Sequence, residues 1–198
     1  MMKIWLPMLV YTFLQAFTPG PNNLTSLYLG GAYGLRGACK FIIASLGSLF
    51  VKVLLCGLLN VALSSVIPAL VKWLAWAGAA YMLYLAIGMI LSGWQTGGSA
   101  GPALRTESTY RDGIILQLLN GKSWVSSLSI FAVYVMPVST KLSTVFIVCV
   151  VYIFLMTCAT LTWTVFGSTL KNFISRHRKP FGVVMGLSLI WCAVTAVL

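Results

Sequence analysis

A long apolar run near the N-terminus is interrupted by residues 18–23, which read Thr-Pro-Gly-Pro-Asn-Asn. Pro19 and Pro21 each remove a backbone donor, and each pushes the residue before it out of the helical region. A continuous helix therefore cannot pass through this segment. If the run lies in a membrane, irregular backbone is tolerated only where it is buried in protein or lines a wet cavity. The interruption therefore predicts a binding site inside a membrane protein.

The composition places the chain in that class. Of its 198 residues, 60% are hydrophobic and 8% are charged, and the mean hydropathy is +0.97. A soluble domain carries about 25% charged residues, so the sequence predicts an all-α integral membrane protein in contact with the lipid bilayer. The net charge of +11 does not indicate a nucleic-acid partner. The basic residues lie between apolar runs, where the positive-inside rule puts them.

The cysteines and the single histidine form no metal or catalytic set. The five cysteines are odd in number and include no Cys-x-x-Cys pair, and His177 lies in a basic loop. Cysteines within apolar runs usually serve as small apolar residues. We therefore expect no metal site, no cofactor and no catalytic nucleophile.

Apolar runs divide the chain into six candidate spans, since a membrane-crossing helix needs about 20 residues. The only stretch with the composition of a linker covers residues 93–111. This linker separates a first half, residues 1–92, from a second half, residues 112–198. The expected spans cover residues 4–33, 41–63, 69–92, 113–136, 142–168 and 181–198.

Basic residues are unevenly distributed between the two sides of this arrangement. Eight lie in the turns after the first, third and fifth spans, and only Lys3 and Lys141 lie on the opposite side. Because cytoplasmic loops carry the excess of lysine and arginine, the linker is expected in the cytoplasm and both termini outside it. The eight are Arg36, Lys40, Arg105, Arg111, Lys171, Arg176, Arg178 and Lys179.

A second interruption, at residues 120–122, reads Asn-Gly-Lys and lies in the fourth span. With three spans in each half, the two halves are expected to have opposite orientations, and each then opens with an interrupted helix. Gln15 precedes the first interruption and Gln117 precedes the second. Paired interruptions in two inverted halves are typical of the substrate site of a secondary transporter.

The first interruption offers two complementary helix ends. The half-helix ending near Phe17 presents free carbonyls, which suit a cation, and the half-helix starting near Pro21 presents free amides, which suit a carboxylate. Together they match the charges of an amino acid, and Asn22 and Asn23 add polar side chains. The alternative is a structural kink whose asparagines face a neighbouring helix.

Two lysines lie unusually deep within spans, where an ionisable residue costs about 3 kcal/mol on insertion scales. Lys122 is a candidate for the substrate carboxylate, or else a lysine reaching the interface. Lys52 has no obvious acidic partner, so it either faces a water-filled path or is neutral at times. Tyr81 lines the cavity or packs in the core. The candidate substrate-binding residues are Gln15, Thr18, Pro19, Gly20, Pro21, Asn22, Asn23, Lys52, Tyr81, Gln117, Asn120 and Lys122.

Three segments resemble a known family. Residues 18–23 followed by Gly34-Leu35-Arg36 resemble the first signature of the lysine exporter and homoserine/threonine exporter superfamily (LysE/RhtB). Residues 78–86 resemble its third-helix pattern, and residues 119–124 its Asn-Pro-Lys signature, with glycine in place of proline. Tyr11-Thr12 and residues 76–81 look closest to the cysteine/O-acetylserine exporter branch.

The resemblance implies a non-enzymatic exporter of amino acids or close derivatives in a prokaryotic inner membrane, driven by the proton-motive force. Gly121 and Lys52 depart from the family pattern, and no acidic residue lies clearly within a span to carry a proton. The alternatives are efflux of a cation such as cadmium, which the lack of buried carboxylates disfavours, and a membrane enzyme or assembly subunit. Gly30-x-x-x-Gly34 predicts close packing between spans or between subunits of a homo-oligomer.

Overall fold

The computed structural model describes residues 2–94 and 110–197, and every regular element in these ranges is helical. The predicted all-α class is confirmed. Residues 95–109, which make up most of the predicted linker, lie outside the described residues. The elements are α1 (Met2–Phe17), α2 (Pro21–Leu58), α3 (Asn60–Trp94), α4 (Tyr110–Leu119), α5 (Gly121–Ser129), the π-helix η1 (Ile130–Val135), α6 (Leu142–Thr169), α7 (Lys171–Arg176) and α8 (Arg178–Val197).

Four helical stretches in the described residues are long and apolar enough to cross a membrane: Pro21–Leu58, Trp73–Trp94, Leu142–Thr169 and Arg178–Val197. Spans one and four are interrupted as the sequence predicted, because a helix ends at each interruption. The first is divided between α1 and the start of α2, and the fourth is divided among α4, α5 and η1. The chain also passes from α2 to α3 at Leu59, earlier than the predicted boundary near residue 63.

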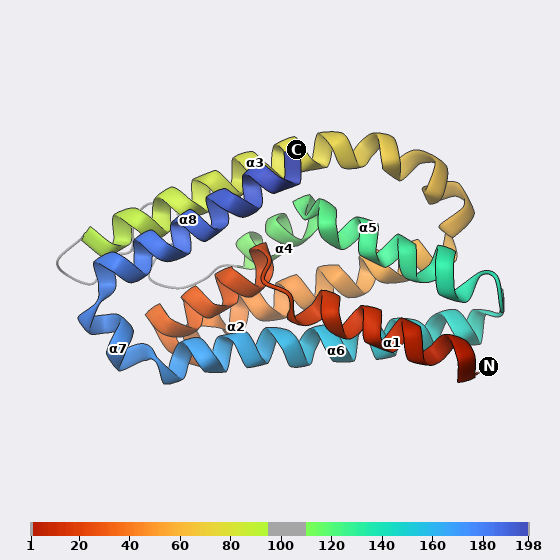
Figure 1. The fold of residues 1–198 in the computed structure, drawn as a ribbon, viewed down its shortest axis with the longest axis horizontal. Coiled ribbons are helices and arrows are strands. Elements are labelled where there is room, and N and C mark those ends of the chain that lie inside the picture. The colour runs from red at the N-terminus through yellow and green to blue at the C-terminus, as the bar shows by residue number, and fades with distance from the viewer. Residues whose placement is uncertain (1, 95–109, 198) are drawn as a thin grey trace.

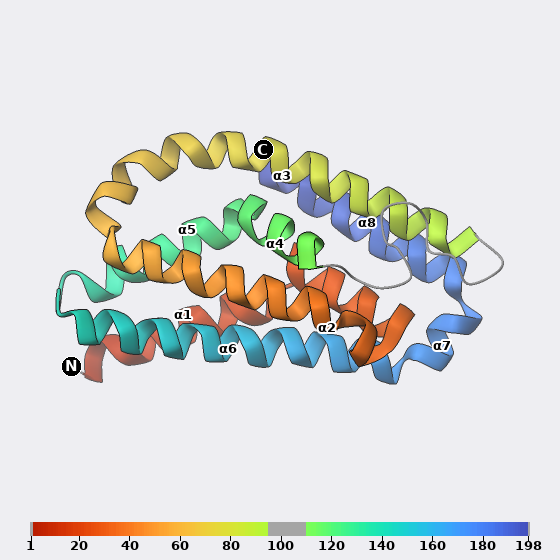
Figure 2. The ribbon, with the colours of Figure 1, turned by 180° about the vertical axis from the view of Figure 1, so that it is seen from behind.

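Helix α2 is folded into two antiparallel limbs, residues 21–33 (the first limb) and residues 35–58 (the second limb). Gly34 separates them with φ 74° and ψ −179°, a conformation that glycine adopts without strain. Asn22 Nδ2 lies 3.4 Å from Ser45 Oγ, although 23 residues of straight helix would extend about 35 Å. The chain therefore reverses at Gly34 itself, whereas the sequence predicted a basic turn over residues 34–40 (Figure 2).

The helices lie along the long axis of the molecule, with α3 and α8 side by side and α2 beside α6 (Figure 1). Glycines bring several of these pairs into backbone contact. A Cβ at Gly30 would collide with the backbone of Thr164, and one at Gly182 would collide with the carbonyl of Met89. Gly30 and Gly182 thus pack between helices of a single chain.

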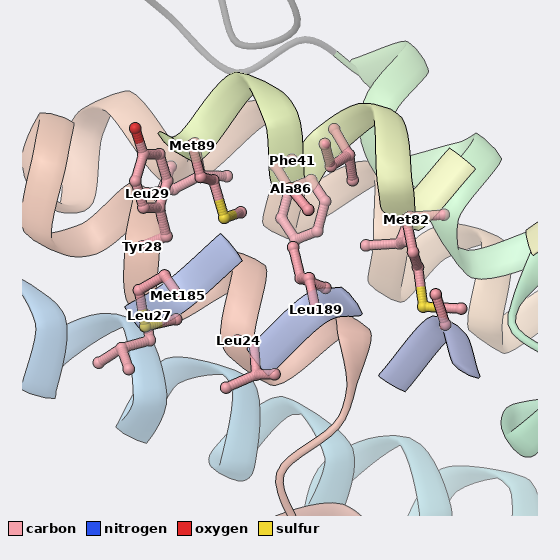
Figure 3. Packing of buried hydrophobic residues seen from close by; sticks show 14 of the residues in the cluster. Leu24, Leu27, Tyr28, Leu29, Phe41, Met82, Ala86, Met89, Met185 and Leu189 are labelled. Atoms are coloured by element: carbon pink, nitrogen blue, oxygen red, sulfur yellow. The ribbon is translucent and has the colours of Figure 1, made fainter. Parts of the chain in front are cut away.

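Two apolar clusters fill the interior. The first joins α2, α3 and α8, and the second joins α1, the second limb of α2, η1 and α6. Leu46 packs against both clusters, so the two meet at the level of Leu46 and Ser45. Figure 3 shows side chains of the first cluster, among them Leu24, Leu27, Tyr28, Leu29, Phe41, Met82, Ala86, Met89, Met185 and Leu189.

Candidate functional site

The two interruptions face each other across a small cavity of about 60 Å³. Its walls come from the end of α1, both limbs of α2, the junction of α4 and α5, and α6. Nine of the predicted site residues line it: Gln15, Thr18, Gly20, Pro21, Asn22, Asn23, Gln117, Asn120 and Lys122. Leu46 and Leu49 form part of its apolar wall.

A second cavity, of about 480 Å³, lies against the same interruptions. It extends toward α3 and α8, where Ala75, Met82 and Thr195 line it, and it also takes in Pro19. Its volume falls in the range of about 300–1,000 Å³ that is usual for small-molecule pockets. The residues shared by the two cavities are Gln15, Gly20, Pro21, Asn120, Lys122 and Ser126.

The carbonyl end of the first interruption is occupied by a side chain. Asn23 Nδ2 donates to Ala16 O at 2.7 Å and to Thr18 O at 3.0 Å. The sequence predicted that carbonyls at the end of α1 would receive a cation. The structure changes this expectation, because these two carbonyls already accept hydrogen bonds from Asn23.

The amide end of the same interruption is open. Helix α2 begins at Pro21, and Gly20 before it has extended backbone and provides no side-chain cap. The amides in the first turn of a helix have no partners within the helix. Lys122 Nζ lies 3.9 Å from the position that a Cβ on Gly20 would take. An ammonium group and the positive end of a helix therefore converge at Gly20, which is the arrangement that binds an anion.

A polar network joins the two interruptions. Asn22 Nδ2 donates to Gln117 Oε1, and Ser45 Oγ donates to the same oxygen at 3.4 Å. Gln117 Nε2 donates to Ser123 Oγ at 2.9 Å. Asn120 caps α5 by accepting a hydrogen bond from the Ser123 amide at 3.2 Å.

Two acceptors beside these groups have no hydrogen-bond partner among the described residues. They are Gln15 Oε1 and Asn22 Oδ1, and both are buried. Leaving a buried acceptor unpaired costs about 1–3 kcal/mol. Both residues line the small cavity, so a donor bound there would remove this cost. An ammonium group is a donor of the required kind.

Comparison with known proteins found a family whose model covers most of the chain. The chain matches the LysE type translocator family over residues 13–198. It belongs to that family. It is also similar to the cysteine/O-acetylserine efflux proteins of Escherichia coli K12, with 30% identity over 93% of this chain and 92% of the relative, and of Escherichia coli O1:K1 / APEC, with 31% identity over the same shares. No solved structure matches it significantly.

Membership of the LysE type translocator family makes the chain a membrane transporter rather than an enzyme. The resemblance read from the sequence motifs is thereby confirmed. It rested on residues 18–23 with residues 34–36, on residues 78–86 and on residues 119–124. Residues from 18–23 and from 119–124 line both cavities.

Two predicted site residues of this LysE type translocator line neither cavity. Lys52 is only 1% exposed, so of the two alternatives for this residue the structure does not favour a water-filled path at its side chain. Its ammonium donates to Gln117 O at 3.2 Å and to Ser123 Oγ at 2.5 Å. Tyr81 lies elsewhere and donates to Asp112 Oδ1 at 3.2 Å.

Sequence reasoning missed several small hydroxyl residues of the site. Ser45, Ser123 and Ser126 line the small cavity, as does Tyr152, which lies 3.1 Å from Ser126 Oγ. Serines at positions 123, 126 and 127 recur with the spacing of one helix face, and this pattern was visible in the sequence. Tyr152 stands alone in an apolar run and gave no such signal.

Proposed function

We propose that this transporter exports amino acids or close derivatives from the cytoplasm, and that it binds them between the two interruptions. The proposal is carried by one observation: positively charged groups and unpaired hydrogen-bond acceptors lie around the same site. The uncapped start of α2 and Lys122 offer positive charge near Gly20, and Gln15 Oε1 and Asn22 Oδ1 offer unpaired acceptors. A zwitterion satisfies both sets at once.

The carboxylate end supplies the larger share of the binding free energy. Each hydrogen bond to a charged group contributes about 1.5–3 kcal/mol. Lys122 and the first amides of α2 provide such bonds, and the low dielectric of the interior strengthens them. The ammonium end, with its neutral amide acceptors, sets the orientation of the substrate.

The substrate class is small and polar. The E. coli relatives are named for cysteine and O-acetylserine, and we propose substrates of that size for this chain. The larger cavity has room for a short side chain between α3 and α8, where Ala75, Met82 and Thr195 line it. An extended basic side chain would find no carboxylate among those residues.

Two inverted halves of three spans each account for the pattern of helix contacts. The first limb of α2 packs on α6 at Gly30 and Thr164, and the second limb packs on α4 at Phe41 and Gly113. If each element is replaced by its counterpart in the other half, the pair of the first limb with α6 becomes the pair of α4 with the second limb. The α3–α8 pair stays the same. This reciprocity supports the inverted repeat, in which substrate sites lie where interrupted helices meet.

We propose that the transporter lies in the inner membrane with both termini outside the cytoplasm, because the distribution of basic residues favours this orientation. We also propose that the proton-motive force drives export, as the resemblance implies. A protonophore should abolish net export from energised vesicles, while exchange between two pools of substrate should continue.

Counterflow in proteoliposomes tests the proposed function. Vesicles loaded with cysteine or O-acetylserine should accumulate the labelled form of either compound, and their decarboxylated amines should neither be exchanged nor compete. Esterified analogues should bind far more weakly than the free acids. Exchange of cadmium in place of amino acids, or equal exchange of the amines, would contradict the proposal.

A further inference from the structure

The carbonyl of Gln117 accepts a hydrogen bond from a side chain of another helix. Lys52 Nζ, on the second limb of α2, donates to it at 3.2 Å. In an unbroken α-helix this carbonyl would accept from the amide four residues later, which belongs to Gly121. Helix α4 ends at Leu119 and α5 begins at Gly121. Lys52 thus occupies the acceptor that a helix would need in order to continue through the second interruption.

The first interruption is kept open by different means. Helix α2 begins with Pro21, whose nitrogen carries no hydrogen. The carbonyl of Phe17, four residues earlier, would pair with that nitrogen in a continuous helix. The covalent structure forbids this bond. Gly121 occupies the matching first position of α5 and retains its amide hydrogen.

We propose that Lys52 is a positioning residue that keeps the second interruption open. At Pro21 the helix cannot continue because the nitrogen has no hydrogen, and at Gly121 it does not continue because Lys52 occupies the carbonyl that the Gly121 amide would need. The proposal rests on the proposed function in one respect only, namely that the open interruption holds Lys122 beside Gly20 for the substrate. The effect of Lys52 on the backbone at Gly121 does not depend on which substrate is transported.

The other contacts of Lys52 fit this role. Its ammonium also donates to Ser123 Oγ in the first turn of α5, at 2.5 Å, so one side chain ties both sides of the interruption together. Trp124 Nε1 donates to Leu118 O at 2.8 Å, and Lys52 Nζ lies 5.3 Å from the centre of the Trp124 ring. Two carbonyls at the end of α4 are therefore satisfied by side chains. A cation is favourable there because the C-terminal end of a helix is negative.

Loss of the ammonium would free the Gln117 carbonyl for the Gly121 amide. The backbone would then gain from closing α4 into α5, because a buried unpaired carbonyl is costly. Closure would rotate the first turn of α5 and carry Lys122 away from Gly20. A proline at position 121 would prevent closure without Lys52. Asn120 already has extended backbone, with φ −76° and ψ 92°, close to the region that a following proline favours.

The decisive experiment is a rescue. Lys52→Met should lower the rate of cysteine counterflow at subsaturating concentration by about tenfold or more, the loss expected for a hydrogen bond to a charged group. Gly121→Pro alone gives the reference counterflow rate for the proline background. The double variant of Lys52→Met with Gly121→Pro should recover most of the rate that Lys52→Met loses. The matched control, Lys52→Met with Gly121→Ala, retains the amide hydrogen at position 121 and should stay defective.

A second readout separates this proposal from the proposed function. In purified protein, Lys52→Met should lower the melting temperature much less when residue 121 is proline than when it is glycine, whatever the protein transports. If the single variant does not accumulate as folded protein, the double variant with proline should. Equal melting shifts in both backgrounds, failure of both variants to fold, or a double variant as inactive as Lys52→Met would overturn the role assigned to Lys52.

Discussion

Gln15 has a buried side-chain oxygen for which the described part of the chain provides no hydrogen-bond partner. An unpaired acceptor that lines a cavity costs stability in the empty protein and gains a partner when a donor binds. Removal of this oxygen is therefore expected to raise the stability of the empty protein and to lower its affinity for substrate.

Replacement of Gln15 by leucine tests this relation. We expect the empty protein to melt at a higher temperature, because the unpaired oxygen is gone, and the apparent KM for cysteine to rise by about threefold to tenfold for the loss of a neutral acceptor. Gln15→Glu is the matched control, because it retains an oxygen acceptor and should retain affinity. A leucine variant that is less stable and equally active would contradict this role for Gln15.

Among the helices, the two interruptions are the parts of the site that the sequence predicted best. Proline and asparagine act on the backbone within a few residues, so Pro21 and Asn120 could mark helix starts from the sequence alone. The partners of the freed carbonyls were harder to predict. Lys52 is 65 residues away from Gln117, and only the packing of α2 on α4 brings the two together.

Replacing Pro19 and Pro21 together by alanine should restore the amides that the first interruption lacks. We expect α1 to continue into α2, which would pull Asn23 from the carbonyls of Ala16 and Thr18 and cover the amides near Gly20. The variant should insert and fold but lose counterflow. Pro7→Ala, a proline within α1 that lines neither cavity, is the control and should remain active. Retained transport in the double variant would make the interruption a simple kink.

For the whole molecule, composition and the length of the apolar runs predicted the all-helical membrane class, because every apolar run in a membrane protein must satisfy its backbone internally. The reversal at Gly34 was placed close to its observed position. The sequence could not predict that the basic turn would shorten to one glycine. Gly30 packs the first limb on Thr164 of α6, and Gly113 of α4 packs on Phe41 of the second limb, so both contacts join segments that are distant in sequence.

The orientation of the whole molecule is a prediction of the basic-residue distribution. A reporter that is active only outside the cytoplasm should be active when fused after Leu198 and inactive when inserted near Gly98. Fusion after Lys141 provides a second outside position, where the reporter should also be active. The reverse pattern would contradict the predicted topology.

The central claim is that the two interruptions form one site for a zwitterion, with Lys122 at its carboxylate end. The most direct measurement is the apparent affinity of wild type and of Lys122→Met for cysteine and for its decarboxylated amine. Wild type should bind the amino acid at least about tenfold more tightly than the amine, and the methionine variant should lose most of that difference. Lys122→Arg should recover only part of it, because a planar fork does not reproduce a compact ammonium. Equal affinities in wild type, or an unchanged ratio in the methionine variant, would contradict the account.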